Sequence, residues 1–272
     1  MNLDALPAVC INLRRRNDRW RQFQAQPGLH LFPPVERFEA VDGSQMDILK
    51  DPQLGISACR NIMTGVRRSH HEIVAKNSVA IYHSHVNTWR YLLEKTDAPA
   101  LIIMEDDVRI DSDSYIKLKM LFDHPIIQSG DWDIVNPGAL VKQRTDIDDI
   151  ISKYDYSYLF HFYIVSRRGA ERLLERPYPI EVHVDHYAAL LAQMGKLKIY
   201  GPRQRIFYQR SNDSDNRDGV CQTCHIPDNA NETGKYIWNS RLQTYQLEES
   251  LLAIGLLLGG IYLAKKYIVG KK

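Results

Sequence analysis

The sequence has few cysteines, almost no net charge and no uninterrupted hydrophobic run of the roughly 20 residues that a membrane span needs. The 4 cysteines are too few for a disulfide framework in a chain of 272 residues. With 35 basic and 33 acidic residues the net charge is +2, so the overall charge does not indicate nucleic acid as a partner. Residues 1–7 lack the basic and apolar regions of a signal peptide, and we therefore expect a cytosolic protein.

The sequence does contain an acidic cluster directly after a short apolar run. Leu101–Met104 is typical of a strand buried on both faces of a sheet. It is followed without a spacer by Glu105, Asp106 and Asp107. In open α/β sheets ligands bind at the carboxyl ends of strands, where these acids would lie. Neighbouring carboxylates repel one another, and Mg²⁺ or Mn²⁺ makes such a cluster favourable. A solvated turn of ordinary surface acids is the alternative.

A second strand end carries basic residues. The apolar strand expected at Ala8–Ile11 leads into a segment with five arginines within eight residues, 14–21. Many α/β proteins bind a nucleotide at such a junction of strand, loop and helix, and arginines suit a diphosphate. A solvated helix face is the alternative interpretation.

Strands that alternate with helical segments predict an α/β fold with a mixed, mostly parallel sheet flanked by helices. Apolar residues at steps of three and four predict a helix over 76–94, with His85 on its apolar face, where a hydrogen-bonded core histidine is the common case. Ser166 is expected to cap a helix over 167–175, and Asp185 a helix over 187–194. Further strands are expected at 36–41, 132–136, 159–165, 196–200 and 206–208, a helix at 115–122, and a variable loop with one short helix at 44–71.

Four sequence blocks stand out together in a fixed order. They are Ile11–Leu13 with Arg16, Asp18 and Arg19; Arg37–Gly43; Ser84, His85 and Trp89, followed by Glu105–Val108; and Ile164–Ala170 with Leu173 and Leu174, followed by Val184 and Asp185. Each block is weak alone, but the ordered set resembles glycosyltransferase family 25, the lipopolysaccharide and procollagen galactosyltransferase-like group. The resemblance covers roughly residues 8–215.

The resemblance implies a GT-A-like fold and a metal-dependent, inverting transfer of a hexose, galactose or glucose, from a UDP-sugar to a glycan or glycoprotein acceptor. It implies that Asn12, Arg16 and Arg19 lie against the nucleotide sugar, with His85 at the same site.

The same resemblance gives the acids their roles. A Mn²⁺ or Mg²⁺ ion on Asp107, with Glu105 and Asp106 as further metal residues, would neutralise the donor diphosphate as the glycosidic bond breaks. Asp185 is the predicted general base that takes the proton of the acceptor hydroxyl, and a plain helix-capping role is its alternative.

One departure from the family pattern keeps other functions open. Ahead of the Ser-His pair the family typically carries a Gly-Glu-hydrophobic-Gly-Cys run, whereas residues 77–81 read Asn-Ser-Val-Ala-Ile. This difference favours, as the alternative, a degenerate protein that binds a nucleotide sugar or glycan without turnover. A metal-dependent phosphoester hydrolase is less favoured, because the sequence shows no second cluster of metal ligands.

We expect three segments: a glycosyltransferase domain over 1–215, a polar linker over 216–246 and a hydrophobic tail over 247–272. In the linker, Cys221, Cys224 and His225 have the spacing of a haem attachment or half a zinc site, but two reduced thiols are the favoured interpretation. The tail holds an uncharged run of 14 residues, 251–264, that is apolar all round. It predicts membrane attachment through a C-terminal hydrophobic helix, with a core helix docked on the domain as the alternative.

Overall fold

The computed structural model describes residues 1–210 and 220–221. One unit comprises Met1–His225. The predicted boundary at 215, all but two residues of the predicted linker, and the whole hydrophobic tail lie outside the described residues. Membrane attachment therefore remains a prediction. Among the helices of the described part, none has the length and apolar character that a membrane crossing requires.

The described residues form helices and strands in alternation. The main strands are β1 (Ala8–Asn12), β2 (Val35–Glu39), β4 (Ala100–Glu105), β6 (Ile134–Val135), β7 (Leu140–Asp146), β8 (Ile151–Tyr158), β9 (Phe162–Ser166) and β10 (Ile199–Pro202). Short strands are β3 (Val66–Arg67), β5 (Val108–Arg109), β11 (Tyr208–Gln209) and β12 (Val220–Cys221). The helices are α1 (Asn17–Gln24), α2 (Ile56–Thr64), α3 (Lys76–Lys95), α4 (Ser114–Phe122), α5 (Pro125–Gln128), α6 (Arg167–Leu174) and α7 (Val184–Gln193).

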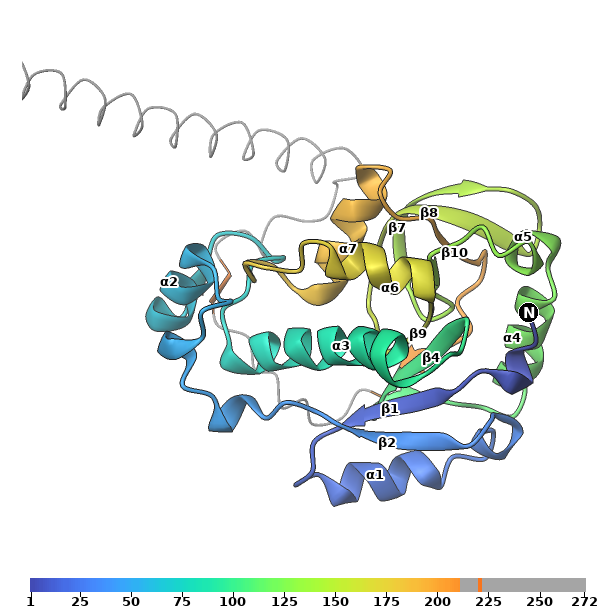
Figure 1. Cartoon of the computed structure of the whole chain (residues 1–272), viewed down its shortest axis with the longest axis horizontal. Helices are drawn as coiled ribbons and strands as arrows, with labels where there is room; N and C mark the ends of the chain where they lie inside the picture. Colours follow the sequence, from blue (N-terminus) through green and yellow to red (C-terminus); the bar gives the residue numbers. More distant parts are fainter. Residues whose placement is uncertain (211–219, 222–272) are drawn as a thin grey trace, which may run out of the picture. The chain divides into compact units, whose positions relative to one another are not determined.

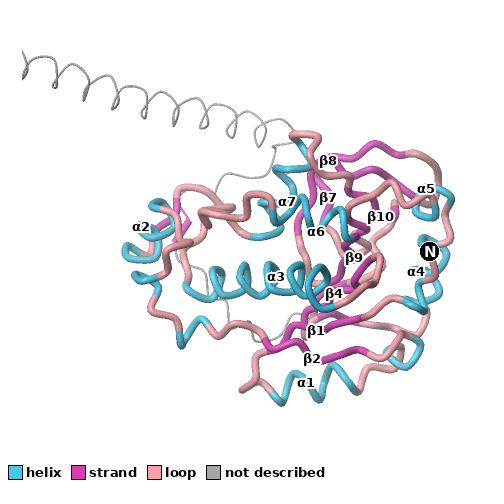
Figure 2. The backbone as a smooth tube through the Cα atoms, viewed as in Figure 1, coloured by secondary structure: helices cyan, strands magenta, loops and turns pink. Residues whose placement is uncertain are grey.

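The main strands of the described part make one eight-stranded sheet, ordered β2-β1-β4-β9-β6-β10-β8-β7 (Figures 1 and 2). Strands β9 and β8 run against the other six, so the expected mixed, mostly parallel sheet is confirmed. Two small sheets pair β11 with β5 and β12 with β3. The second pair places the backbone of Cys221 beside Arg67, while Cys224 and His225 lie outside the described residues.

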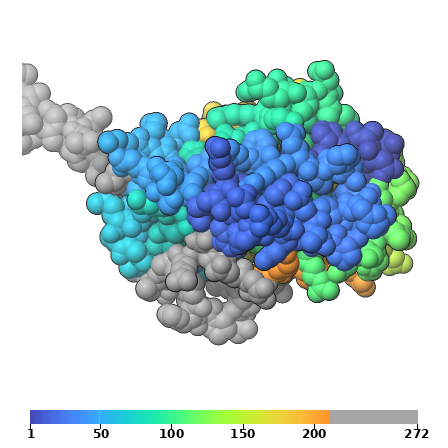
Figure 3. All heavy atoms as spheres, turned by 90° about the horizontal axis from the view of Figure 1, so that it is seen from below, coloured from blue at the N-terminus to red at the C-terminus, as the bar shows by residue number. Residues whose placement is uncertain are grey.

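Strand β4 is buried on both faces, as its apolar run predicts. Leu101 and Ile103 belong to the core that α3, α6 and α7 cover. Ile102 and Met104 belong to the core that α1 and α4 cover. All four side chains are 0% exposed. Figure 1 shows α3 and α6 side by side. Figure 3 views the molecule from below, with the N-terminal part of the chain, in blue, in the middle of that face.

The structure differs from the sequence predictions in two places, the hairpin of β7 and β8 and the start of α7. The hairpin of β7 and β8 was not predicted, although Tyr154, Tyr156 and Tyr158 recur at every second residue, the period of a strand. The mostly exposed, polar β7 offers no such pattern. The prediction that Asp185 caps a helix starting at Tyr187 was wrong, because α7 begins at Val184 and Asp185 lies within its first turn.

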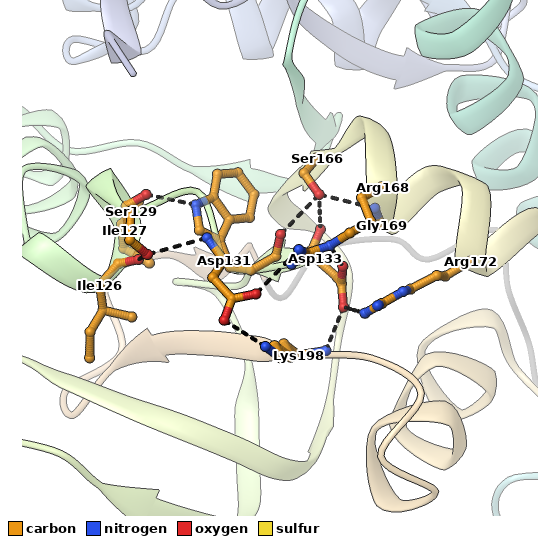
Figure 4. A network of polar contacts seen from close by, with 11 residues as sticks. Ile126, Ile127, Ser129, Asp131, Asp133, Ser166, Arg168, Gly169, Arg172 and Lys198 are labelled. Carbon is orange, nitrogen blue, oxygen red and sulfur yellow. Dashed lines mark hydrogen bonds and ion pairs between the residues drawn. The ribbon is translucent and has the colours of Figure 1, made fainter.

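A buried carboxylate fastens α6 to the sheet. Asp133, just before β6, is 0% exposed. It accepts hydrogen bonds from Nε of Arg168 at 2.8 Å, from a guanidinium nitrogen of Arg172 at 2.5 Å and from the backbone N–H of Lys198 at 2.8 Å (Figure 4). Two side chains of α6 and the backbone just before β10 thus donate to one buried carboxylate.

The start of α6 explains why its sequence block has a fixed form. Ser166 is the N-cap, as predicted, and its Oγ accepts a hydrogen bond from the N–H of Gly169 at 3.0 Å. A Cβ atom at Gly169 would collide with the backbone carbonyl of Asp133. The block Ile164–Ala170 therefore holds α6 tightly against β6, which is a structural role.

Replacing Asp133 with alanine should lower the free energy of unfolding by about 3–5 kcal/mol, because two guanidinium groups and one N–H lose a buried acceptor. Chemical denaturation followed by circular dichroism measures the change. Asp131→Ala is the matched control, since Asp131 pairs with Arg168 and Lys198 but is 58% exposed and should cost about 0–1 kcal/mol. Equal losses in the two variants would contradict this role of Asp133.

Candidate functional site

The parallel pairing of β1 with β4 brings the basic and acidic strand ends together (Figure 1). Ile11 is the register partner of Glu105, so Asn12 and Asp106 follow at the same edge of the sheet. Both side chains are buried, at 1% and 6% exposure. The carboxyl ends of two neighbouring parallel strands thus form the predicted location for a ligand.

The carboxylate of Asp106 is held by two of the residues predicted to contact the nucleotide. Asn12 donates from Nδ2 to one carboxylate oxygen at 2.5 Å, and Arg19 donates to the other at 3.0 Å. Arg37 donates from Nε to Oδ1 of Asn12 at 2.8 Å, which fixes the amide's orientation. We call this set of four residues the Asp106 clamp. It joins β1, β2, α1 and the turn after β4.

Arg37 is the first residue of the sequence block Arg37–Gly43. Its place in that block is the signal in the sequence that points to a role at the site. Arg16 lies next to the Asp106 clamp, since its carbonyl accepts from Nδ2 of Asn12 at 3.3 Å. Its guanidinium pairs with Asp18 at 2.9 Å, and this hydrogen bond lowers the pKa of Asp18 to about 2. The structure therefore brings Asn12, Arg16 and Arg19 together, as predicted.

Glu105 points to a different environment. Its Oε1 lies 3.1 Å from Nε2 of His85, which is 0% exposed on α3. Nδ1 of His85 lies 3.0 Å from the hydroxyl of Tyr163, and that hydroxyl accepts from Nε1 of Trp89 at 2.8 Å. Burial lowers the pKa of His85 to about 4, so the ring is neutral. His85 therefore has the contacts of a hydrogen-bonded core histidine, and one of them is an acid of the site.

Asp107 is the acid with spare bonding capacity. Its Oδ1 is buried and has no hydrogen-bond partner within the described part of the chain. Burial raises the pKa of Asp107 to about 7, and the charges of Glu105 and Asp106 add to the rise. The backbone N–H of Arg210 donates to the Asp107 carbonyl at 2.8 Å, and the Arg210 guanidinium donates to the carbonyl of Asp106. Arg210 was not predicted; it directly follows β11, which pairs with β5 beyond the acids.

Asp185 approaches the acids from α7. Its two oxygens accept from the backbone N–H groups of Leu159 and His186, each at 2.8 Å. Burial raises the pKa of Glu105 to about 8, with further contributions from the charges of Asp106 and Asp185. Asp185 thus lies close enough to Glu105 to act on it, although the two residues are far apart in the sequence.

The three acids predicted as metal residues have three different sets of contacts. A search of residues 1–210 and 220–221 finds no group of three or more His, Cys, Asp or Glu side chains that could hold a metal ion. Mg²⁺ often takes only one or two carboxylates and completes its coordination with phosphate oxygens and water. Asp107 fits such a site through its buried Oδ1. Asp106 fits less well, because both of its oxygens already accept hydrogen bonds.

The chain matches the family described as Glycosyltransferase family 25 (LPS biosynthesis protein) over residues 6–188. It is 28% identical over 190 residues to "Glycosyltransferase 25 family member" of Anopheles gambiae. It is 26% identical over 198 residues to "Procollagen galactosyltransferase 1" of Danio rerio and 25% over 189 residues to "Procollagen galactosyltransferase 2" of Homo sapiens.

These alignments cover 66%, 70% and 66% of this chain but only 31%, 32% and 29% of the relatives. The chain thus spans less than a third of the length of these curated relatives. The solved crystal structure of A197 from STIV aligns with 79% of this chain and 99% of that chain at 12% identity. Its TM-score of 0.35 is too low to support an argument.

The two neighbouring acids Asp106 and Asp107 should differ in what their substitution does to the free energy of unfolding. Asp106→Asn should lower the free energy of unfolding by about 3 kcal/mol, because Arg19 and Asn12 lose a buried charged acceptor. Asp107→Asn should leave it unchanged or raise it, since Oδ1 has no donor to lose and a like charge beside Glu105 disappears. Denaturant unfolding in the presence of EDTA measures both. A larger loss in Asp107→Asn than in Asp106→Asn would contradict the Asp106 clamp.

Proposed function

Because the chain belongs to glycosyltransferase family 25, we propose that it transfers a hexose from a UDP-sugar to a glycan or glycoprotein acceptor with inversion. Two relatives are named procollagen galactosyltransferases, which favours galactose over glucose. The proposal includes a GT-A-like fold. Its support is the helix-flanked sheet, with basic and acidic residues at the carboxyl ends of β1 and β4.

The observation that carries the proposal is that two carboxylates from separate elements interact electrostatically with Glu105. Asp107 follows β4, and its pKa is raised by burial and by the charge of Glu105. Asp185 belongs to α7, and its charge contributes to the raised pKa of Glu105 after burial and Asp106. Sugar transfer requires one site for a leaving diphosphate and another for an acceptor proton. Two carboxylates on different elements, each of which interacts with Glu105, suit these two needs.

On the donor side, Asp107 is the residue proposed to hold a divalent cation. A bound cation would neutralise the charge that the diphosphate gains as the glycosidic bond breaks. The positive charges of Arg19 and Arg210 act on Asp107 and oppose the rise of its pKa, so they reduce the repulsion among the acids. The Asp106 clamp fixes Arg19 and Asn12 beside the same strand end.

On the acceptor side, Asp185 is proposed as the general base. Its carboxylate takes the proton of the acceptor hydroxyl while that oxygen bonds to the anomeric carbon of the donor. The electron pair of the broken carbon–oxygen bond leaves with UDP, and the proton remains on Asp185. The N–H groups of Leu159 and His186 hold the carboxylate in one orientation, which such a transfer requires.

A panel of nucleotide sugars tests the proposed function. The full chain is incubated with each donor and Mn²⁺, and free nucleotide is measured with and without candidate glycan and glycoprotein acceptors. We expect UDP release that depends on both a hexose donor and an acceptor. UDP binding without any sugar transfer would identify the degenerate alternative. Hydrolysis of phosphoesters in the absence of any sugar donor would identify the hydrolase alternative.

Asp107→Asn should abolish the metal-dependent part of UDP binding, because the buried oxygen proposed as the metal ligand loses its charge. Isothermal calorimetry of UDP with Mn²⁺ and with EDTA measures that part directly. Asp111→Asn is the control, since this aspartate, 46% exposed, pairs with Arg109. Unchanged Mn²⁺-dependent binding in Asp107→Asn would contradict the assignment.

Asp185→Asn should reduce turnover by about 10²- to 10⁴-fold, because an amide does not take the acceptor proton. UDP affinity and thermal stability should remain close to those of the unmodified chain, since the amide oxygen still accepts a backbone hydrogen bond. Steady-state rates with a saturating donor, combined with thermal unfolding, separate the two effects. Near-normal turnover would show that Asp185 only secures the first turn of α7.

A further inference from the structure

A cluster of parallel rings lies next to Asp185. The rings of His71 and His186 are stacked with centroids 4.0 Å apart and an angle of 10° between their planes. The ring of Tyr158 stacks on His71 at 5.3 Å and 16°. The three residues come from the segment before α3, from α7 and from the end of β8. Sequence positions more than 80 apart are thus brought to one place.

The cluster and the Asp185 carboxylate are fixed to each other through the backbone. Tyr158 directly precedes Leu159, whose N–H donates to one oxygen of Asp185. The other oxygen accepts from the N–H of His186, the residue that carries one of the stacked rings. Leu159 has a positive φ of 73°, the left-handed region that residues with a side chain seldom adopt. The backbone therefore turns directly after Tyr158, at the residue whose N–H contacts Asp185.

The cluster has a buried side and a more open side. His186 and Tyr156 are buried, at 1% and 9% exposure, and the Tyr156 hydroxyl lies 3.1 Å from Nδ1 of His186. Burial lowers the pKa of His186, with added effects of His71 and His183, so its ring stays neutral. His71 and Tyr158 are half-buried. His186 stacks on His71, and Tyr156 packs edge-on against Tyr158 at 4.9 Å, so the buried residues pack directly against the two half-buried rings.

We propose that Tyr158 and His71 form the acceptor subsite and bind a pyranose ring, so that the acceptor is a sugar rather than a lone hydroxylated side chain. This inference rests on the proposed role of Asp185. A pyranose has an apolar face of C–H groups and a rim of hydroxyls. Aromatic rings offer a rigid apolar surface for such a face, and a few fixed polar groups then set the orientation. A sugar packed on Tyr158 presents its rim to Asp185.

The position of the cluster relative to the donor side supports this assignment. Asp185 acts on Glu105 and His85, which belong to the acidic side of the site. Its backbone contacts lead to Tyr158 and His186. A base that takes a proton from an acceptor must reach the attacking hydroxyl while that oxygen faces the donor. Asp185 interacts both with Glu105 of the acidic cluster and with the backbone that carries the ring cluster.

The test measures direct binding of methyl hexopyranosides to the full chain by saturation-transfer NMR, without nucleotide. Tyr158→Leu should weaken binding by about tenfold, which corresponds to about 1.4 kcal/mol, whereas Tyr158→Phe should retain it. Tyr91→Leu is the matched control, because Tyr91, on α3, is a half-buried tyrosine that packs on Phe38 of β2. His71→Leu is the second variant and should also weaken binding, whether or not Tyr158→Leu folds.

Unchanged saccharide binding in both ring variants, or no binding by the unmodified chain, would overturn the subsite. Binding of a peptide that carries a hydroxylated side chain in place of the saccharides, with the same sensitivity to Tyr158→Leu, would overturn the sugar class. The proposed function is tested separately, by Mn²⁺-dependent binding of UDP and by nucleotide release. Saccharide binding that is lost in the ring variants, in a chain that neither binds UDP nor releases it, would uphold the subsite and contradict the transferase.

Discussion

The hydrogen bonds to the carboxylate of Asp106 determine how the other groups of the site are arranged. One oxygen accepts from Asn12 on β1 and the other from Arg19 on α1, while Arg37 on β2 fixes the amide of Asn12. A single buried charge thus connects two strands and a helix to the turn after β4. Because consecutive residues leave a strand end in different directions, Glu105 is left to contact His85, and Asp107 keeps a buried oxygen without a partner.

This arrangement assigns separate roles to acids that look equivalent in the sequence. Asp106 is a positioning residue, whereas Asp107 is suited to a cation and Glu105 connects the site to the core under α3. The buried or half-buried positions of the three acids and their mutual repulsion raise the pKa values of Glu105 and Asp107. On the proposed function, a bound divalent cation would offset this repulsion.

Much of this fold follows from local patterns. The apolar run at Leu101–Met104 predicted a strand covered on both faces, and β4 is such a strand because α3 and α4 cover its two sides. Ser166 predicted the start of α6, and the structure adds why Gly169 follows: a side chain there would collide with the backbone of Asp133. The placing of Asn12, Arg16 and Arg19 at one site was what the family resemblance implied, and the rule that ligands bind at strand ends placed the acids at such an edge.

Other features depend on contacts between distant parts of the chain, which periodicity does not contain. The hairpin of β7 and β8 could not be predicted, because β7 is polar and mostly exposed. The contacts of Arg37, Arg210 and Tyr163 arise only from the pairing of strands that are distant in the sequence. The different contacts of Glu105, Asp106 and Asp107 could not be predicted either, since they depend on which neighbouring side chains reach each carboxylate.

The most direct test of this account is a crystal structure of the full chain with UDP and Mn²⁺, in which anomalous scattering locates the metal. The account predicts one Mn²⁺ peak at about 2.0–2.2 Å from Oδ1 of Asp107, in contact with the diphosphate, with Asp106 still bound to Asn12 and Arg19. A peak on Asp106, with Arg19 and Asn12 displaced from its carboxylate, would contradict it.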